Sequence, residues 1–113
     1  MKDLRNRVQL IGNLGMDPEV KSFDGGRKLA KFSVATSQSY TSNKGERVKD
    51  TQWHNIIAWG KLAETAEKYL KKGSEVALEG KLVYRSYETK EGQTKYITEI
   101  VLNDFMMFSK KQS

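Results

Sequence analysis

The chain has 113 residues, of which 37% are hydrophobic, 10% aromatic and 30% charged. This length suits one domain and argues against a two-domain enzyme with a cleft between its domains. Lysine and arginine number 20 against 14 aspartate and glutamate, which gives a formal net charge of +6. Such a surplus suits a polyanionic partner, although ordinary solubility charge explains it equally well.

The sequence lacks the residues that several classes of functional site require. The chain has no cysteine, which excludes disulfides, cysteine-rich zinc sites and thiol catalysis. A single histidine, His54, offers little for a His-based metal site or a serine triad. No run of about 18 apolar residues is present, so no membrane segment is predicted. The charged N-terminus does not resemble a secretory signal, and we expect a cytoplasmic protein.

Alternating apolar residues predict strands over most of the chain. In the first strand, Val8, Leu10 and Leu14 share one face, and Gly12 interrupts that face. A glycine inside a strand indicates a bulge, a bend or a close approach of another backbone.

The next elements follow from turn signals and alternation. Residues 20–23 form a short limb before the hairpin turn at 24–26, and a strand follows over 29–36. Residues 37–50 are almost all polar and form either a long exposed loop or the extended tip of a hairpin. Residues 51–59 are predicted to form a strand.

One segment has helical spacing, and two strands follow it. The apolar positions of the helix are Leu62, Ala63, Ala66, Tyr69 and Leu70, and Gly73 is well placed as its C-terminal cap. The closing strands, 76–85 and 96–102, flank a turn at 90–92, and Gly80 interrupts the first of them. The order of these strands and the helix along the chain predicts an all-β fold with one helix. This fold is a five-stranded OB-fold Greek-key barrel, with the helix between the third and fourth strands.

Catalysis has little support in the sequence. No nucleophile or acid–base pair has partners near it, and Gly25-Gly26 lacks the spacing of a phosphate-binding loop. Glu75 and Glu79 share a strand face, but nothing completes a metal site with them. We therefore predict no catalytic residue, no metal and no cofactor.

The aromatic residues are more informative. Tyr40 and Tyr87 are flanked by polar residues, which makes them candidate platforms for stacking bases. Strand alternation places Trp53 and Trp59 on the same face as Ile57. From this pattern alone, each tryptophan can be either a core residue or a stacking platform. Basic residues lie near these rings in the sequence, as a groove for single-stranded nucleic acid requires: Lys44, Arg47, Lys49, Lys61 and Arg85.

Other residues have plain structural explanations. Tyr69 and Phe32 are predicted core residues, and Phe105 and Phe108 are expected to close the barrel. His54 fits a core or interface position better than a ligand position.

Three strings of the sequence are similar to one known family. They are VQLIGNLGMDPEV at 8–20, WHNIIAWGKLAE at 53–64 and YLKKGSEVALEGKL at 69–82. The three strings occur in the same order and with the same spacing as in the bacterial single-stranded-DNA-binding protein family, which the chain resembles over residues 4–108. The resemblance implies an OB-fold DNA-binding domain over 1–108, followed by a short basic and polar tail at 109–113.

The resemblance further implies a homotetramer that binds single-stranded DNA without strong sequence preference during replication, recombination and repair. Its site residues fall here on aromatic and basic positions, with one histidine at the subunit interface. The stacking aromatics are Tyr40, Trp53, Trp59 and Tyr87; the basic positions are Arg7, Lys49, Lys61, Lys72 and Arg85; the interface residue is His54.

Two departures from the family pattern bear on function. Family members often have tryptophan where this chain has Tyr40 and Tyr87, and phenylalanine at the position of Trp59. They also continue into an acidic tail that recruits replication and repair enzymes, so tail-mediated partners are not predicted for this sequence. Two alternatives stay open: an assembly module that binds a protein through its sheet, and a preference for RNA, because stacking does not distinguish the sugar.

Overall fold

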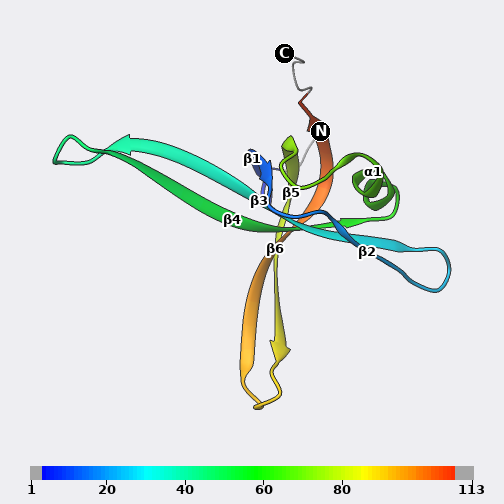
Figure 1. Cartoon of the computed structure of the whole chain (residues 1–113). Helices are drawn as coiled ribbons and strands as arrows, with labels where there is room; N and C mark the ends of the chain where they lie inside the picture. Colours follow the sequence, from blue (N-terminus) through cyan, green and yellow to red (C-terminus); the bar gives the residue numbers. More distant parts are fainter. Residues whose placement is uncertain (1–3, 109–113) are drawn as a thin grey trace.

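A computed structural model describes residues 4–108, which form six strands and one helix (Figure 1). The predicted tail at 109–113 lies outside the described residues. In chain order the elements are β1 (Val8–Leu14), β2 (Glu19–Ser22), β3 (Lys28–Thr41), β4 (Arg47–Trp59), α1 (Lys61–Tyr69), β5 (Glu75–Glu88) and β6 (Thr94–Met107).

Five of the strands close into a barrel, which confirms the predicted fold class. The sheet runs β1-β5-β6-β4-β3-β2, and two further pairs between β1 and β3 close it, Asn13 with Ala35 and Leu14 with Val34. The short β2 is an appendage on the edge of β3. Because β2 counts as a strand, the helix lies between the fourth and fifth strands of the structure, and between the third and fourth long ones.

The barrel interior is filled by the alternate residues of each strand. Phe32, Val34, Ile56 and Ile100 belong to one buried cluster, as the alternation predicts. Phe105 packs partly buried against this cluster, whereas Phe108 is exposed and does not close the barrel.

The helix covers the barrel through small side chains. Ala63 and Ala66 are fully buried, and the chain leaves the helix at Leu70, which is extended and buried. Leu70 takes the inward position, so the preceding Tyr69 is 53% exposed and the prediction of a core Tyr69 is wrong. Gly73 is not the helix cap either: it lies in the following turn and donates its N–H to the Leu14 carbonyl.

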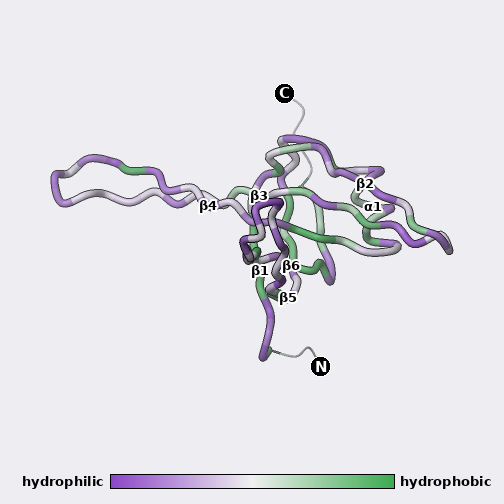
Figure 2. The backbone as a smooth tube through the Cα atoms, turned by 90° about the horizontal axis from the view of Figure 1, so that it is seen from below, coloured by the Kyte–Doolittle hydropathy of each residue, from purple (hydrophilic) through white to green (hydrophobic). Residues whose placement is uncertain are grey.

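The polar stretch 37–50 is the extended tip of a hairpin, the second of the two predicted alternatives. The β3–β4 ladder continues without a break from Leu29 opposite Trp59 to Thr41 opposite Arg47. This hairpin and the β5–β6 hairpin leave the barrel in different directions (Figure 1). The outer part of the β3–β4 hairpin is almost entirely polar (Figure 2), so backbone hydrogen bonds, not a hydrophobic core, hold it together.

The two strand glycines lie where another backbone comes close. A Cβ at Gly12 would lie 2.2 Å from the Ala35 carbonyl oxygen, and a Cβ at Gly80 would lie 2.4 Å from that of Val101. Gly80 also lies at a bulge in the β5–β6 ladder. Both glycines therefore let strands cross closely, the third of the possibilities that the sequence raised for Gly12.

We expect Gly80→Ala to destabilise the fold by about 1–3 kcal/mol, because the added methyl group has no room beside the Val101 carbonyl. Denaturant unfolding followed by circular dichroism measures this loss. Gly25→Asn is the control: Gly25 has a φ of 86° in an open turn, and asparagine tolerates that conformation. A Gly80→Ala protein as stable as the control would contradict the close approach.

Candidate nucleic-acid interface

The outer face of β4 carries both tryptophans. Ile56 and Ala58 point into the barrel, and the alternate residues Trp53, Ile57 and Trp59 point outward. Trp53 is 61% exposed and Trp59 is 38% exposed, so neither indole is a core residue. Trp59 lies six positions after Trp53 along the strand, which corresponds to about 20 Å along the outer face.

Trp53 is supported from below by a glycine. A Cβ on Gly15 would lie 2.3 Å from the indole atom Cζ3 of Trp53. The ring therefore packs directly on the Gly15 backbone, and only a residue without a side chain fits beneath it. This role of Gly15 was not predicted from the sequence, although a glycine within the 8–20 string was a signal for it.

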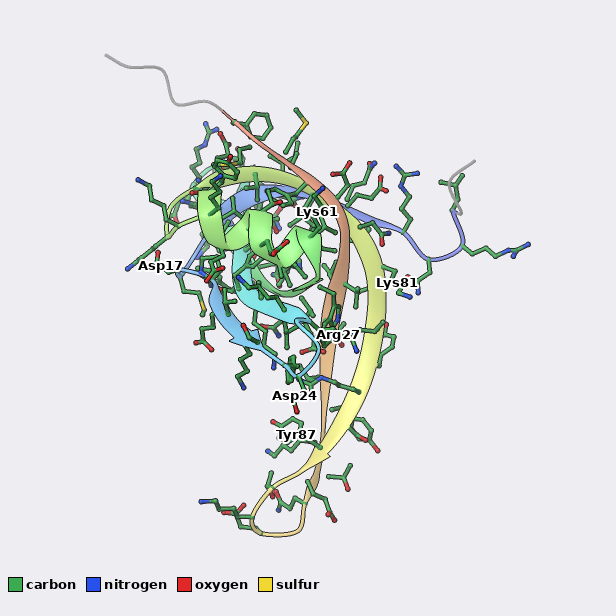
Figure 3. All side chains as sticks on the ribbon, turned by 90° about the vertical axis from the view of Figure 1, so that its right-hand side faces the viewer. Asp17, Asp24, Arg27, Lys61, Lys81 and Tyr87 are labelled. Atoms are coloured by element: carbon green, nitrogen blue, oxygen red, sulfur yellow. The ribbon has the colours of Figure 1, made fainter. Side chains whose placement is uncertain are left out.

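Trp59 is partly covered from the turn between β2 and β3. The Arg27 guanidinium carbon lies 4.7 Å from the centroid of the indole, and the Phe23 ring lies 6.1 Å from it at a tilt of 32°. Figure 3 labels Arg27 in this turn. Neither residue was predicted from the sequence, because no spacing rule connects the 24–26 turn with the end of β4.

Tyr40 and Lys49 lie on opposite faces of the β3–β4 hairpin. Ser39 pairs with Lys49 and Tyr40 pairs with Val48. By alternation, Lys49 shares its face with Trp53, whereas Tyr40 shares the other face with His54. The hairpin thus places Lys49 on the same face as Trp53 and Tyr40 on the opposite face. The side chains of Tyr40, Lys49 and Trp53 are all exposed.

Arg85 and Tyr87 point from the same face of β5. The Nε and Nη2 atoms of Arg85 donate to the two carboxylate oxygens of Glu99, at 2.7 and 2.9 Å. Glu99 is only 3% exposed, and its hydrogen bonds and negative charge raise the pKa of Arg85. Tyr87 is exposed and lies farther out on the hairpin, away from the helix that carries Lys61 (Figure 3).

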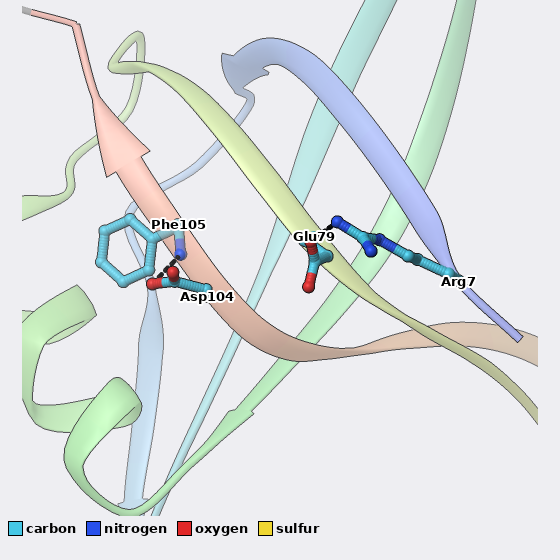
Figure 4. A network of polar contacts seen from close by, with 4 residues as sticks. All are labelled: Arg7, Glu79, Asp104 and Phe105. Atoms are coloured by element: carbon cyan, nitrogen blue, oxygen red, sulfur yellow. Dashed lines mark hydrogen bonds and ion pairs between the residues drawn. The ribbon is translucent and has the colours of Figure 1, made fainter. Parts of the chain in front are cut away.

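The remaining predicted residues are scattered around the barrel. Arg7, which immediately precedes β1, pairs with Glu79 of β5 (Figure 4). Lys61 begins the helix two residues after Trp59, and Lys72 lies in the turn after the helix, where its backbone N–H donates to Asp17. His54 is half-buried, and its Nε2 lies 2.9 Å from the Thr36 hydroxyl.

Residues 4–108 lack the features of a metal site and of a membrane-spanning helix. This part of the chain contains no group of three or more histidine, aspartate or glutamate side chains that could hold a metal ion. Nor does it contain a helix with the length and apolar character that crossing a membrane requires.

The sequence of this chain is similar to those of known single-stranded DNA-binding proteins. Residues 5–108 match the Single-strand binding protein family. Single-stranded DNA-binding protein 1 of Chlorobaculum tepidum is 45% identical over 96% of this chain and 67% of its own length. The single-stranded DNA-binding protein of Neisseria meningitidis serogroup A is 47% identical over 90% of this chain and 59% of its own length, so the chain spans well under two thirds of that relative.

Solved structures have the same fold. The SSB of Plasmodium falciparum, solved in complex with ssDNA, superposes with a TM-score of 0.86 at 34% identity and covers 96% of this chain and 99% of that one. A deletion mutant of the Thermus aquaticus single-stranded DNA binding protein gives a TM-score of 0.78 at 25% identity, over 92% of this chain and 50% of that one. With its closed barrel, its outward indoles and a family match over nearly its whole length, the chain belongs to the Single-strand binding protein family.

Proposed function

We propose that this protein binds single-stranded DNA without strong sequence preference and protects it during replication, recombination and repair. The observation that carries the proposal is the pair of exposed indoles on the outer face of β4, with Lys49 in line beyond Trp53. Unpaired bases stack on such rings whatever their identity, and a duplex cannot do so because its bases are already stacked.

The rings contribute unequally in this proposal. Trp53 packs against Gly15 and is still 61% exposed, so a base can reach its ring. Trp59 has Arg27 over its ring, so a base reaches it at the other face or after Arg27 moves. Tyr40 and Tyr87 lie out on separate hairpins, where they extend the same mode of binding to nucleotides farther along the strand.

The cations also divide into two groups. Lys49, Lys61 and Lys72 are exposed, and we assign them to phosphate contacts that release counterions. Arg7 and Arg85 each face a carboxylate, Glu79 and Glu99, which offsets their attraction for a phosphate. We therefore assign these two arginines a smaller share of the salt-dependent binding than their positions in the family pattern suggest.

The proposal includes a homotetramer in the cytoplasm, associated with the nucleoid. A barrel of this size buries only a modest share of its surface, so association adds stability. His54 lies half-buried on the hairpin face opposite Trp53, and we propose that this face meets a neighbouring subunit. Light scattering measures the number of subunits in solution.

We expect oligo(dT) to quench the tryptophan fluorescence strongly, because bases would cover the exposed indoles of Trp53 and Trp59. A matched duplex should quench little. The measurement is a fluorescence titration of the wild-type chain with each nucleic acid, and oligo(U) in a third titration compares RNA. No quenching by any of them would contradict the proposal and favour a module that binds protein.

We expect Trp53→Ala to weaken oligo(dT) binding by about 1–3 kcal/mol, the value of one stacked base. The slope of log affinity against log salt should not change, because the indole carries no charge. Anisotropy of a labelled oligonucleotide at several salt concentrations measures both quantities. Tyr84→Ala is the control: that ring is exposed on the face of β5 opposite Arg85 and Tyr87, and its loss should leave affinity unchanged.

We expect Lys49→Gln to reduce the magnitude of the salt slope by roughly 0.7, the share of one phosphate contact on a single strand. Lys28→Gln is the control for loss of one positive charge, because Lys28 already pairs with Glu67 at 3.1 Å. The same anisotropy series compares the two variants. Equal slopes for Lys49→Gln and the wild type would remove Lys49 from the proposed phosphate path.

A further inference from the structure

The point where the two hairpins separate contains a small pocket. β4 and β6 pair in parallel at only three positions, from Asn55 opposite Glu99 to Ile57 opposite Val101. Beyond them the hairpins diverge (Figure 1). A pocket of about 150 Å³ opens on the outer face at this point, and we call it the junction pocket; its lining includes Ser33, Asn55, Ile57, Arg85, Ile97 and Glu99.

Two of the three charged residues in this pocket, Arg85 and Glu99, offset each other, and the third, Lys31, adds one positive charge to the lining. Glu99 is buried and accepts both hydrogen bonds from Arg85, which fixes the guanidinium in one orientation. The pair carries no net charge, and its two charge-assisted hydrogen bonds offset part of the cost of burying Glu99. Even so, 48% of the Arg85 side chain stays exposed. The guanidinium is therefore held in one orientation while about half of the side chain stays accessible, and a planar guanidinium can stack on a ring.

The rest of the lining suits a planar ring with polar edges. Ile57 and Ile97 supply apolar contact, while Ser33 and Asn55 supply a hydroxyl and an amide. The volume is about five times the roughly 30 Å³ that one water occupies in the liquid, which is room for a ring system but not for a folded partner.

The pocket is continuous with the aromatic face described above. Asn55 and Ile57 lie between Trp53 and Trp59 on the same face of β4. A strand whose bases stack on both indoles must pass over the intervening residues, and therefore over this pocket.

We propose that the junction pocket holds one nucleobase of the bound strand, stacked on the guanidinium plane of Arg85. This inference rests on the proposed binding of single-stranded DNA. It assigns Arg85 to base stacking, a role that planar guanidinium groups take with unpaired bases, and not to phosphate neutralisation. Glu99 is the positioning residue that holds the plane in place.

Ser33→Leu tests the pocket, because leucine adds bulk to its lining without any change in charge. We expect oligo(dT) affinity to fall by about 5- to 150-fold, the equivalent of one lost stacked base, with an unchanged salt slope. Ser86→Leu is the matched control: Ser86 is exposed on β5, on the face opposite Arg85, and this variant should bind as the wild type does. Anisotropy titrations at several salt concentrations give both quantities.

A second variant removes the stacking plane and keeps the net charge. Arg85→Met combined with Glu99→Met replaces a neutral ion pair by two apolar side chains, an exchange that proteins often tolerate. We again expect a fall of about 5- to 150-fold in affinity with an unchanged slope. Thermal unfolding followed by circular dichroism checks that each variant is folded.

The outcomes separate this inference from the proposed function. If the wild type fails to bind oligo(dT), the proposed function itself is wrong. If the wild type binds and the folded pocket variants bind equally well, only the pocket assignment is wrong. A salt slope that falls by roughly 0.7 in the Arg85 and Glu99 double variant would make Arg85 a phosphate contact and overturn the assignment.

Discussion

The three-residue parallel pairing of β4 with β6 is the contact on which the outer face depends. It is the only ladder in residues 4–108 that joins the β3–β4 hairpin to the β5–β6 hairpin, apart from the closure through β1. It holds Asn55 beside Glu99, and so places the tryptophan face of β4 next to the arginine face of β5. Each hairpin could form by local pairing, but neither alone would bring indoles and guanidinium to one surface.

The architecture was predictable to the extent that it follows from alternation and turn chemistry. Strand parity placed Trp53, Ile57 and Trp59 on one side, and Phe32 with Val34 on the other, because successive strand residues point to opposite faces. The end of the helix was not predictable in this way. Leu70 leaves the helix to fill the inward position, which exposes Tyr69, and only the completed barrel determines which of the two adjacent apolar residues is buried.

The candidate site depended on contacts that spacing cannot show. Nothing within β4 indicates that Gly15 lies under Trp53 or that Arg27 covers Trp59, since both come from other parts of the chain. Counts of basic residues likewise overstate what is available to a polyanion. Arg85 and Arg7 both face carboxylates, so the formal charge of +6 is less evenly spread over the surface than the sequence suggests.

Tyr40 and Lys49 point to opposite faces of the β3–β4 hairpin, and this constrains the path of any long polymer that contacts both side chains. A chain lying along the Trp53 side meets Lys49 directly, whereas the tyrosine ring points to the reverse side of a ribbon only two strands wide. To touch both, the polymer has to turn around the edge of the ribbon. The polymer would then loop around the hairpin, and the length of that loop would set how many of its units one copy of the chain contacts.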